Sequence, residues 1–95
     1  HAGQEMAGRH AAVVLTPRAY AIATGLALVV PMTTKVKGGS FEVPIIGADK
    51  AKGVALANEI RSIDYTARDA RLFDKCPPRP FQRILDIGFA LLKAE

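Results

Sequence analysis

The stretch TGLALVVPMTT, residues 24–34, decides the fold of this chain of 95 residues. Its apolar and β-branched residues form a continuous run of strand length, so they predict a buried strand over residues 25–34. Pro31 interrupts the run and marks an edge or a bulge, because proline cannot donate to a strand ladder. The longest apolar run, residues 26–32, is far shorter than the roughly 20 residues that span a bilayer. We therefore expect no membrane helix.

Shorter segments extend this pattern on both sides. Residues 1–8 are small, polar and aperiodic, which is typical of a loop, and residues 9–16 predict another buried strand. Residues 17–23 can form one helical turn, because proline is tolerated at a first helical position. Downstream of a basic, glycine-bearing loop at 35–40, three more strands are predicted, over residues 41–46, 54–57 and 59–64. The charged segment 65–75 is ambiguous.

The C-terminal segment predicts an amphipathic helix. Three prolines at positions 77, 78 and 80 oppose helix upstream, so the helix is expected to begin near Pro80. An apolar stripe at helical spacing consists of Phe81, Ile84, Leu85, Gly88, Leu91 and Leu92. Short strands followed by one terminal helix indicate a small, mainly β domain of the α+β class, with residues 1–95 as a single unit.

Composition narrows the classes of function. Thirteen Lys and Arg against nine Asp and Glu give a net charge of +4, which favours an anionic partner. A single cysteine, Cys76, excludes an internal disulfide framework and a cysteine zinc site; it fits the cytoplasm and is interpreted as an incidental thiol. The sequence contains none of the motifs GxGxxG, HExxH and GxSxG, nor a P-loop. With only two histidines, His1 and His10, we expect no metal site and no cofactor.

One set of polar residues remains for chemistry. It consists of Glu5, Arg9 and His10 at the start of the first strand, and of Thr33, Thr34, Lys35 and Lys37 at the end of the long strand. Neighbouring strands can bring these ends together into a cleft. Cleavage of RNA by its own 2′-hydroxyl needs such proton acceptors, cations and donors. The alternative is that these are ordinary polar loop residues, and composition alone favours that alternative.

Four segments resemble the MazF/PemK toxin family. Residues 3–17 are similar to its opening G-x-E-Q-x-G-x-R-P-A, and residues 24–34 to its strand T-G-x-x-x-x-x-P-x-T-T/S. Residues 37–43 resemble K-G-x-P-F-E-V, and residues 53–64 resemble the segment that starts G-x-x-L-x-D-Q. The order and the separations agree over nearly the whole chain.

This resemblance implies an SH3-like barrel with a C-terminal amphipathic helix. It also implies a homodimeric toxin of a type II toxin–antitoxin system, with a cognate antitoxin as partner. The expected activity is metal-independent, sequence-specific cleavage of single-stranded RNA, leaving a 2′,3′-cyclic phosphate and a 5′-hydroxyl. Two alternatives stay open: a catalytically degenerate module that binds an antitoxin without cleaving RNA, and a gyrase poison of the same fold.

The resemblance also implies roles for individual residues. Thr33 aligns with the catalytic threonine of the family, and Glu5 with the acidic residue of its active-site loop. The family's catalytic arginine is His10 here, so His10 and the neighbouring Arg9 are expected to share its work. RNA binding is assigned to Thr34, Lys35, Lys37, Glu59 and Arg61.

Two departures from the family pattern carry expectations of their own. Glu59 stands where the family has glutamine, and its charge needs a cation such as Arg61 to offset it. The leading strand of the family has no counterpart in this sequence. An N-terminally truncated domain with one unpaired strand edge is therefore expected.

Overall fold

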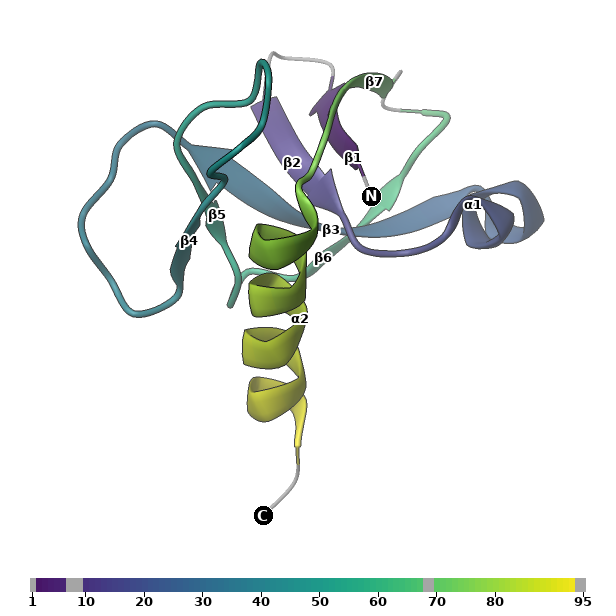
Figure 1. The fold of residues 1–95 in the computed structure, drawn as a ribbon. Coiled ribbons are helices and arrows are strands. Elements are labelled where there is room, and N and C mark those ends of the chain that lie inside the picture. The colour runs from purple at the N-terminus through teal and green to yellow at the C-terminus, as the bar shows by residue number, and fades with distance from the viewer. Residues whose placement is uncertain (1, 7–9, 68–69, 94–95) are drawn as a thin grey trace.

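The computed structural model describes residues 2–6, 10–67 and 70–93, with residues 2–6 described by their backbone only (Figure 1). The strands are β1 (Ala2–Met6), β2 (His10–Val14), β3 (Leu26–Thr33), β4 (Glu42–Pro44), β5 (Val54–Leu56), β6 (Arg61–Asp64) and β7 (Arg71–Lys75). The helices are α1 (Arg18–Thr24) and α2 (Pro78–Leu92). All strand pairs among the described residues are antiparallel, and together with the terminal helix they confirm the predicted α+β class. No helix in the described ranges is both long and apolar enough to cross a membrane.

Strand β3 is the centre of the sheet, whose order is β4-β5-β3-β2-β1-β7 with β6 also paired to β3. Strand β2 pairs with β3 through Val29, Val30 and Pro31. On the other side, β6 pairs with the first half of β3, and β5 pairs with Met32 and Thr33. Strand β3 as a whole has partners on both sides, so it is not an edge strand, but Pro31 itself pairs only with Ala12 of β2. Pro31 falls between the two segments that pair with β6 and β5, where that side of the ladder changes partner.

The two ends of the sheet are linked by a side chain. Asp74 in β7 accepts hydrogen bonds at Oδ2 from the backbone N–H groups of Lys50 (2.7 Å) and Ala51 (2.8 Å), which belong to the β4–β5 connection. Gly47 of the same connection also lies against Pro77, since a Cβ at Gly47 would be 3.5 Å from the proline ring. The sheet therefore curls until β7, at one end of the strand order, approaches the β4–β5 connection at the other end, as the expected barrel requires.

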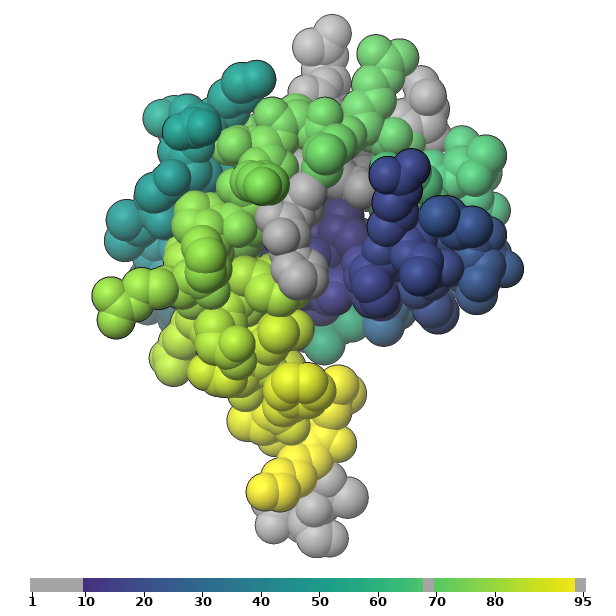
Figure 2. Space-filling view, turned by 45° about the vertical axis from the view of Figure 1, so that its right-hand side comes forward, coloured from purple at the N-terminus to yellow at the C-terminus, as the bar shows by residue number. Residues whose placement is uncertain are grey.

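The main core lies between this curled sheet and α2. It contains Val13, Val30, Val43, Ile45, Ala51, Ala55, Ala57, Cys76, Phe81 and Ile84. Helix α2 begins at Pro78, two residues before the predicted start, because prolines are tolerated in a first turn whose N–H groups have no partner in the helix. The predicted stripe is buried at Phe81, Ile84 and Gly88 but exposed at Leu91 and Leu92, where α2 projects beyond the sheet (Figures 1 and 2).

The other differences between the predicted and the observed elements lie in segments with a weak hydrophobic pattern. Residues 1–8 were expected to be a loop, yet Ala2–Met6 is a strand held between β2 and β7. Small polar residues have low strand propensity, so pairing on both sides decides this segment. The ambiguous segment 65–75 contains β7, and the strand predicted over 41–46 is limited to Glu42–Pro44. The predicted helical turn at 17–23 is confirmed as α1.

Candidate functional site

Thr33 occupies the last position of β3, where the strand opens into the β3–β4 connection. Its backbone pairs with Val54 of β5, and its Oγ1 accepts a hydrogen bond from the Lys35 backbone N–H at 3.0 Å. A hydroxyl has one proton and two lone pairs, so the Thr33 O–H can still donate. Accepting from an amide also polarises the hydroxyl and strengthens it as a donor. This geometry suits a hydrogen bond from Thr33 to an anionic oxygen.

The strand register brings two other predicted residues to the same end of the sheet. Ala12 and Pro31 form the last pair of the β2–β3 ladder at this end, so His10 and Thr33, each two residues further along its strand, lie at the same end of the sheet. In the next strand, Met6 pairs with His10 and the backbone of Glu5 pairs with Ala11. His10 is exposed. The side chain of Glu5 and the whole of Arg9 lie outside the described part of the structure.

Thr33 and His10 share one face of the sheet. Side chains alternate along a strand, so odd positions of β3 lie on one face and even positions on the other. Val29 belongs to a small cluster on the odd face, whereas Val30 belongs to the core under α2. Thr33 is odd-numbered, and the register gives His10 the same face. The candidate site therefore lies on the side of the sheet away from α2.

The first basic loop, residues 34–41, follows Thr33 directly. One carboxylate organises it: Glu42 accepts hydrogen bonds from the Gly38 N–H (2.8 Å) and, through both oxygens, from the Lys37 N–H (3.1 and 3.2 Å). The side chains of Lys35 and Lys37 are exposed. Glu42 was missed as a site residue because the sequence pattern assigned it only to a strand. Its position a few residues after the Lys37-Gly38 pair is the signal that could have identified it.

The second basic loop, residues 45–53, reaches Thr33 from another part of the chain. Gly53 has a φ of +92°, and a Cβ there would lie 2.2 Å from the Thr33 carbonyl oxygen. Only glycine allows this close approach. Just before Gly53, the Ala51 and Lys50 N–H groups donate hydrogen bonds to Asp74 and lower the pKa of that carboxyl, against a smaller opposing effect of desolvation. This loop was not predicted as part of the site, because the residues that hold it, Thr33 in β3 and Asp74 in β7, lie about twenty residues or more away in the sequence.

Glu59 and Arg61 form an ion pair of 2.8 Å between Oε1 and Nη2. Arg61 thus offsets the carboxylate, although an exposed pair of this kind adds little stability. Arg61 is paired with Val29, four residues before Thr33, which corresponds to about 13 Å along the strand. The structure therefore places this pair on the same face as Thr33 but not in contact with it.

Cys76 lies in the main core rather than at the site. It is 6% exposed, and burial raises the pKa of its thiol. A buried, protonated thiol is a poor nucleophile. This environment agrees with its interpretation as an incidental thiol.

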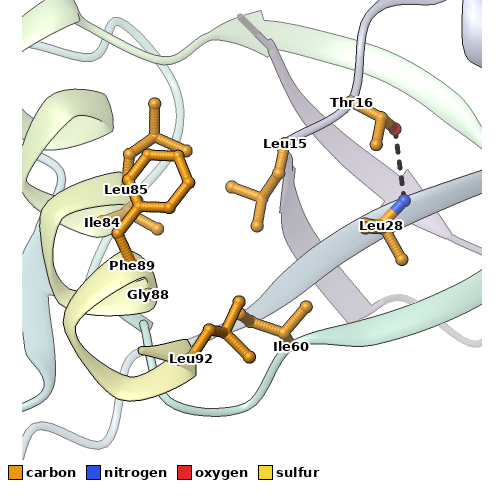
Figure 3. A pocket seen from close by; sticks show the side chains of 9 residues that line it. All are labelled: Leu15, Thr16, Leu28, Ile60, Ile84, Leu85, Gly88, Phe89 and Leu92. Atoms are coloured by element: carbon orange, nitrogen blue, oxygen red, sulfur yellow. Dashed lines mark hydrogen bonds between the residues drawn. The ribbon is translucent and has the colours of Figure 1, made fainter. Parts of the chain in front are cut away.

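An apolar pocket lies on the opposite face of the sheet, between α2 and the β2–α1 connection (Figure 3). Its volume is about 180 Å³, and it is lined by Leu15, Thr16, Leu28, Ile60, Ile84, Leu85, Gly88, Phe89 and Leu92. None of these side chains titrates. The Thr16 hydroxyl already accepts a hydrogen bond from the Leu28 N–H at 3.2 Å. The pocket has no group for acid–base chemistry, whereas the Thr33 end of the sheet offers a hydroxyl, an imidazole and ammonium groups that suit a phosphodiester.

Comparison with known proteins points to one family. Residues 1–87 match the family described as PemK-like, MazF-like toxin of type II toxin-antitoxin system. The chain is 44% identical over 82 residues to the endoribonuclease toxin MazF of Escherichia coli (strain K12), covering 86% of this chain and 73% of that protein.

Solved structures agree with this match. A crystal structure of MazE-MazF from Deinococcus radiodurans has a TM-score of 0.91 at 32% identity, covering 96% of this chain and 91% of that one. MazF alone from the same organism gives 0.84 at 36% identity, covering 97% and 84%. The toxin MazF-mt6 of Mycobacterium tuberculosis, at 15% identity and a TM-score of 0.79 over 100% and 99% of the two chains, shares the fold.

Proposed function

Because the chain belongs to the family of PemK-like, MazF-like toxins of type II toxin–antitoxin systems, we propose that it is an endoribonuclease toxin that cuts single-stranded RNA at short recurring sequences. The observation that carries this proposal is the 44% identity to an endoribonuclease toxin over most of the chain. The arrangement of Thr33 and His10 at one end of the sheet supports it. Residues 1–95 are proposed to act as a single toxin domain.

The proposed reaction is a transesterification within the RNA. The 2′-hydroxyl oxygen attacks the adjacent phosphorus and the bond from phosphorus to the 5′-oxygen breaks. The products carry a 2′,3′-cyclic phosphate and a 5′-hydroxyl. A base must accept the 2′-hydroxyl proton, and an acid must protonate the leaving 5′-oxygen.

Thr33 is assigned to the phosphate and His10 to proton transfer. The Thr33 hydroxyl, polarised by the Lys35 N–H, donates to a non-bridging oxygen as negative charge develops there. Imidazole accepts and donates protons near neutral pH, which guanidinium does not. Arg9 is the proposed cation and Glu5 the proposed base or orienting group; both assignments rest on the family resemblance.

The RNA is proposed to follow the Thr33 face of the sheet. Thr34, Lys35 and Lys37 flank the scissile phosphate at the end of β3. The ion pair between Glu59 and Arg61 lies about 13 Å along the same face, where it can meet a neighbouring nucleotide. Lysine contacts to phosphates add affinity and salt dependence without choosing a base.

A homodimer, a cognate antitoxin and a cytoplasmic location complete the proposal. The antitoxin is supported by the MazE-MazF structures of D. radiodurans, which resemble this chain over nearly its whole length. The homodimer rests on the family resemblance. Light scattering from the purified protein, alone and with a candidate antitoxin, measures both associations.

The decisive test is incubation of a long, mostly unstructured RNA with the purified protein in EDTA, followed by mapping of the 5′ ends. The proposal predicts discrete cuts at a recurring short sequence, each leaving a 5′-hydroxyl. Cleavage only after Mg²⁺ is restored would contradict the metal-independent mechanism. Intact RNA from folded protein would contradict the activity.

His10 in place of the family's arginine favours one alternative, a degenerate toxin that binds an antitoxin without cutting RNA. An imidazole replaces a guanidinium there, so the paired parallel donors that grip a phosphate are lost. Antitoxin binding together with intact RNA would support this alternative. Protein-dependent DNA cleavage by gyrase would instead support a gyrase poison.

A further inference from the structure

The second basic loop carries two lysines that the family resemblance does not assign to the site. Lys50 and Lys52 are both exposed, as are Lys35 and Lys37 of the first basic loop. Within the described residues, none of these four ammonium groups forms an ion pair with a carboxylate. Both loops lie on the β4–β5 side of the molecule, away from the end of α2 (Figure 1).

Lys52 is held close to Thr33 by the residues beside it. Gly53 lies against the Thr33 carbonyl, and its own carbonyl accepts the Ile45 N–H at 3.2 Å. Ala51 on the other side is 8% exposed and packs in the main core. The backbone of Lys52 is therefore fixed at both neighbours, while its side chain is free to move in solvent.

Lys50 is less available than Lys52. Its backbone N–H donates to Asp74, and its positive charge contributes to the lowered pKa of that carboxyl. Part of the Lys50 charge is thus balanced by a nearby anion. Lys52 is the stronger candidate for an external phosphate.

We propose that Lys52, assisted by Lys50, binds a backbone phosphate of the RNA beside the phosphate held at Thr33. This inference rests on the proposed endoribonuclease function and adds a second basic segment to its substrate path. The backbone of the loop is already anchored before RNA arrives, so binding has to order only the lysine side chains. Contacts of this kind position the strand without reading its bases.

The test is the salt dependence of binding to a single-stranded RNA whose 2′-hydroxyls are methylated, so that it cannot be cut. Each lysine–phosphate contact on a single strand contributes about 0.7 to the slope of log affinity against log salt. Lys52→Gln is expected to lower the slope by about 0.7. When the salt concentration rises fourfold, the affinity of the wild type should therefore fall about 2.6-fold further than the affinity of the variant. Lys50→Gln is expected to lower the slope by less, and Lys52→Arg to keep it.

Lys93→Gln is the matched control, because Lys93 follows α2 at the far end of the molecule. A slope for Lys52→Gln equal to that of Lys93→Gln would overturn the inference, even if the wild type cuts RNA. A wild type that binds RNA but does not cut it would contradict the nuclease activity, while the slopes would still decide whether Lys52 binds phosphate. A wild type that does not bind RNA would overturn both.

Discussion

The first basic loop is held by a carboxylate four or five residues away, whereas the second is held by one 23 or 24 residues away. Glu42 and Asp74 hold their loops in the same way, since each carboxylate accepts hydrogen bonds from two consecutive backbone N–H groups. Glu42 shapes only its own hairpin. Asp74 also joins the two ends of the sheet. The carboxylate therefore stabilises only one hairpin in the first loop, whereas in the second it also holds the whole sheet together. Thr33 lies where the two loops meet.

The largest expected effect comes from the glycines of the two loops. Gly53→Ala forces a Cβ onto the Thr33 carbonyl at a φ of +92°. We expect a loss of about 3 kcal/mol or more, from the left-handed conformation and the clash together, and a fall of about 12 °C or more in thermal midpoint. Gly38→Ala in the first loop has a φ of +80° but open space, so it should cost only about 1 kcal/mol. Equal losses in thermal unfolding would show that the second loop is not pressed against Thr33.

Thr33→Ala tests the point where the loops meet. It removes both the acceptor for the Lys35 N–H and the proposed donor to phosphate. We expect RNA cleavage to fall at least about tenfold, or about 1.4 kcal/mol of transition-state stabilisation, while the oligomeric state stays that of the wild type. Thr66→Ala, at an exposed turn position, is the control. An unchanged cleavage rate would remove Thr33 from the site.

Asp74→Ala and Glu42→Ala compare the two anchors directly. We expect Asp74→Ala to lower the thermal midpoint, because it unlinks the two ends of the sheet. Glu42→Ala should leave the midpoint nearly unchanged and weaken RNA binding by loosening the first loop. The reverse order of thermal midpoints would contradict the distinction between a local anchor and a fold-wide one.

The stabilising effect of Asp74 also depends on pH. Its pKa is below the ordinary value of 3.8 in the folded protein, so its carboxylate stabilises the fold above that value and loses this effect as the pH falls through the folded pKa. Unfolding by denaturant should therefore show Asp74→Asn less stable than the wild type at neutral pH. The difference should disappear in acid. A constant difference across this range would exclude the charge of Asp74 as its source.

The smallest change is expected for His10→Arg, which restores the residue of the family at the β2 side of the site. Cleavage should stay the same or rise, since arginine grips phosphate with paired donors. A fall to background would show that the imidazole itself transfers the proton. The rate measured against pH separates the two roles, because only an imidazole that transfers protons makes the rate titrate near neutral pH.

Local patterns predicted the parts of the fold that depend on local forces. The apolar run of β3 and the helical spacing of apolar residues in α2 are both visible within a short stretch of sequence, and both elements were found. Strand β1 was missed because its pairing with β2 and β7, rather than its composition, makes it a strand. At the site, Thr33 and His10 were assigned through the resemblance, and the strand pairing shows that both lie at the same end of the sheet. Gly53 and Asp74 were missed because their partners lie about twenty residues away or more.

Binding of RNA at the Thr33 end of the sheet is tested most directly by backbone amide NMR shifts on titration with the methylated, uncuttable RNA. We expect shifts concentrated in Thr33–Lys37 and in Ala51–Gly53, with the amides of Leu85–Leu92 unchanged. Shifts concentrated along α2 and its apolar pocket, with the two basic loops unaffected, would contradict it.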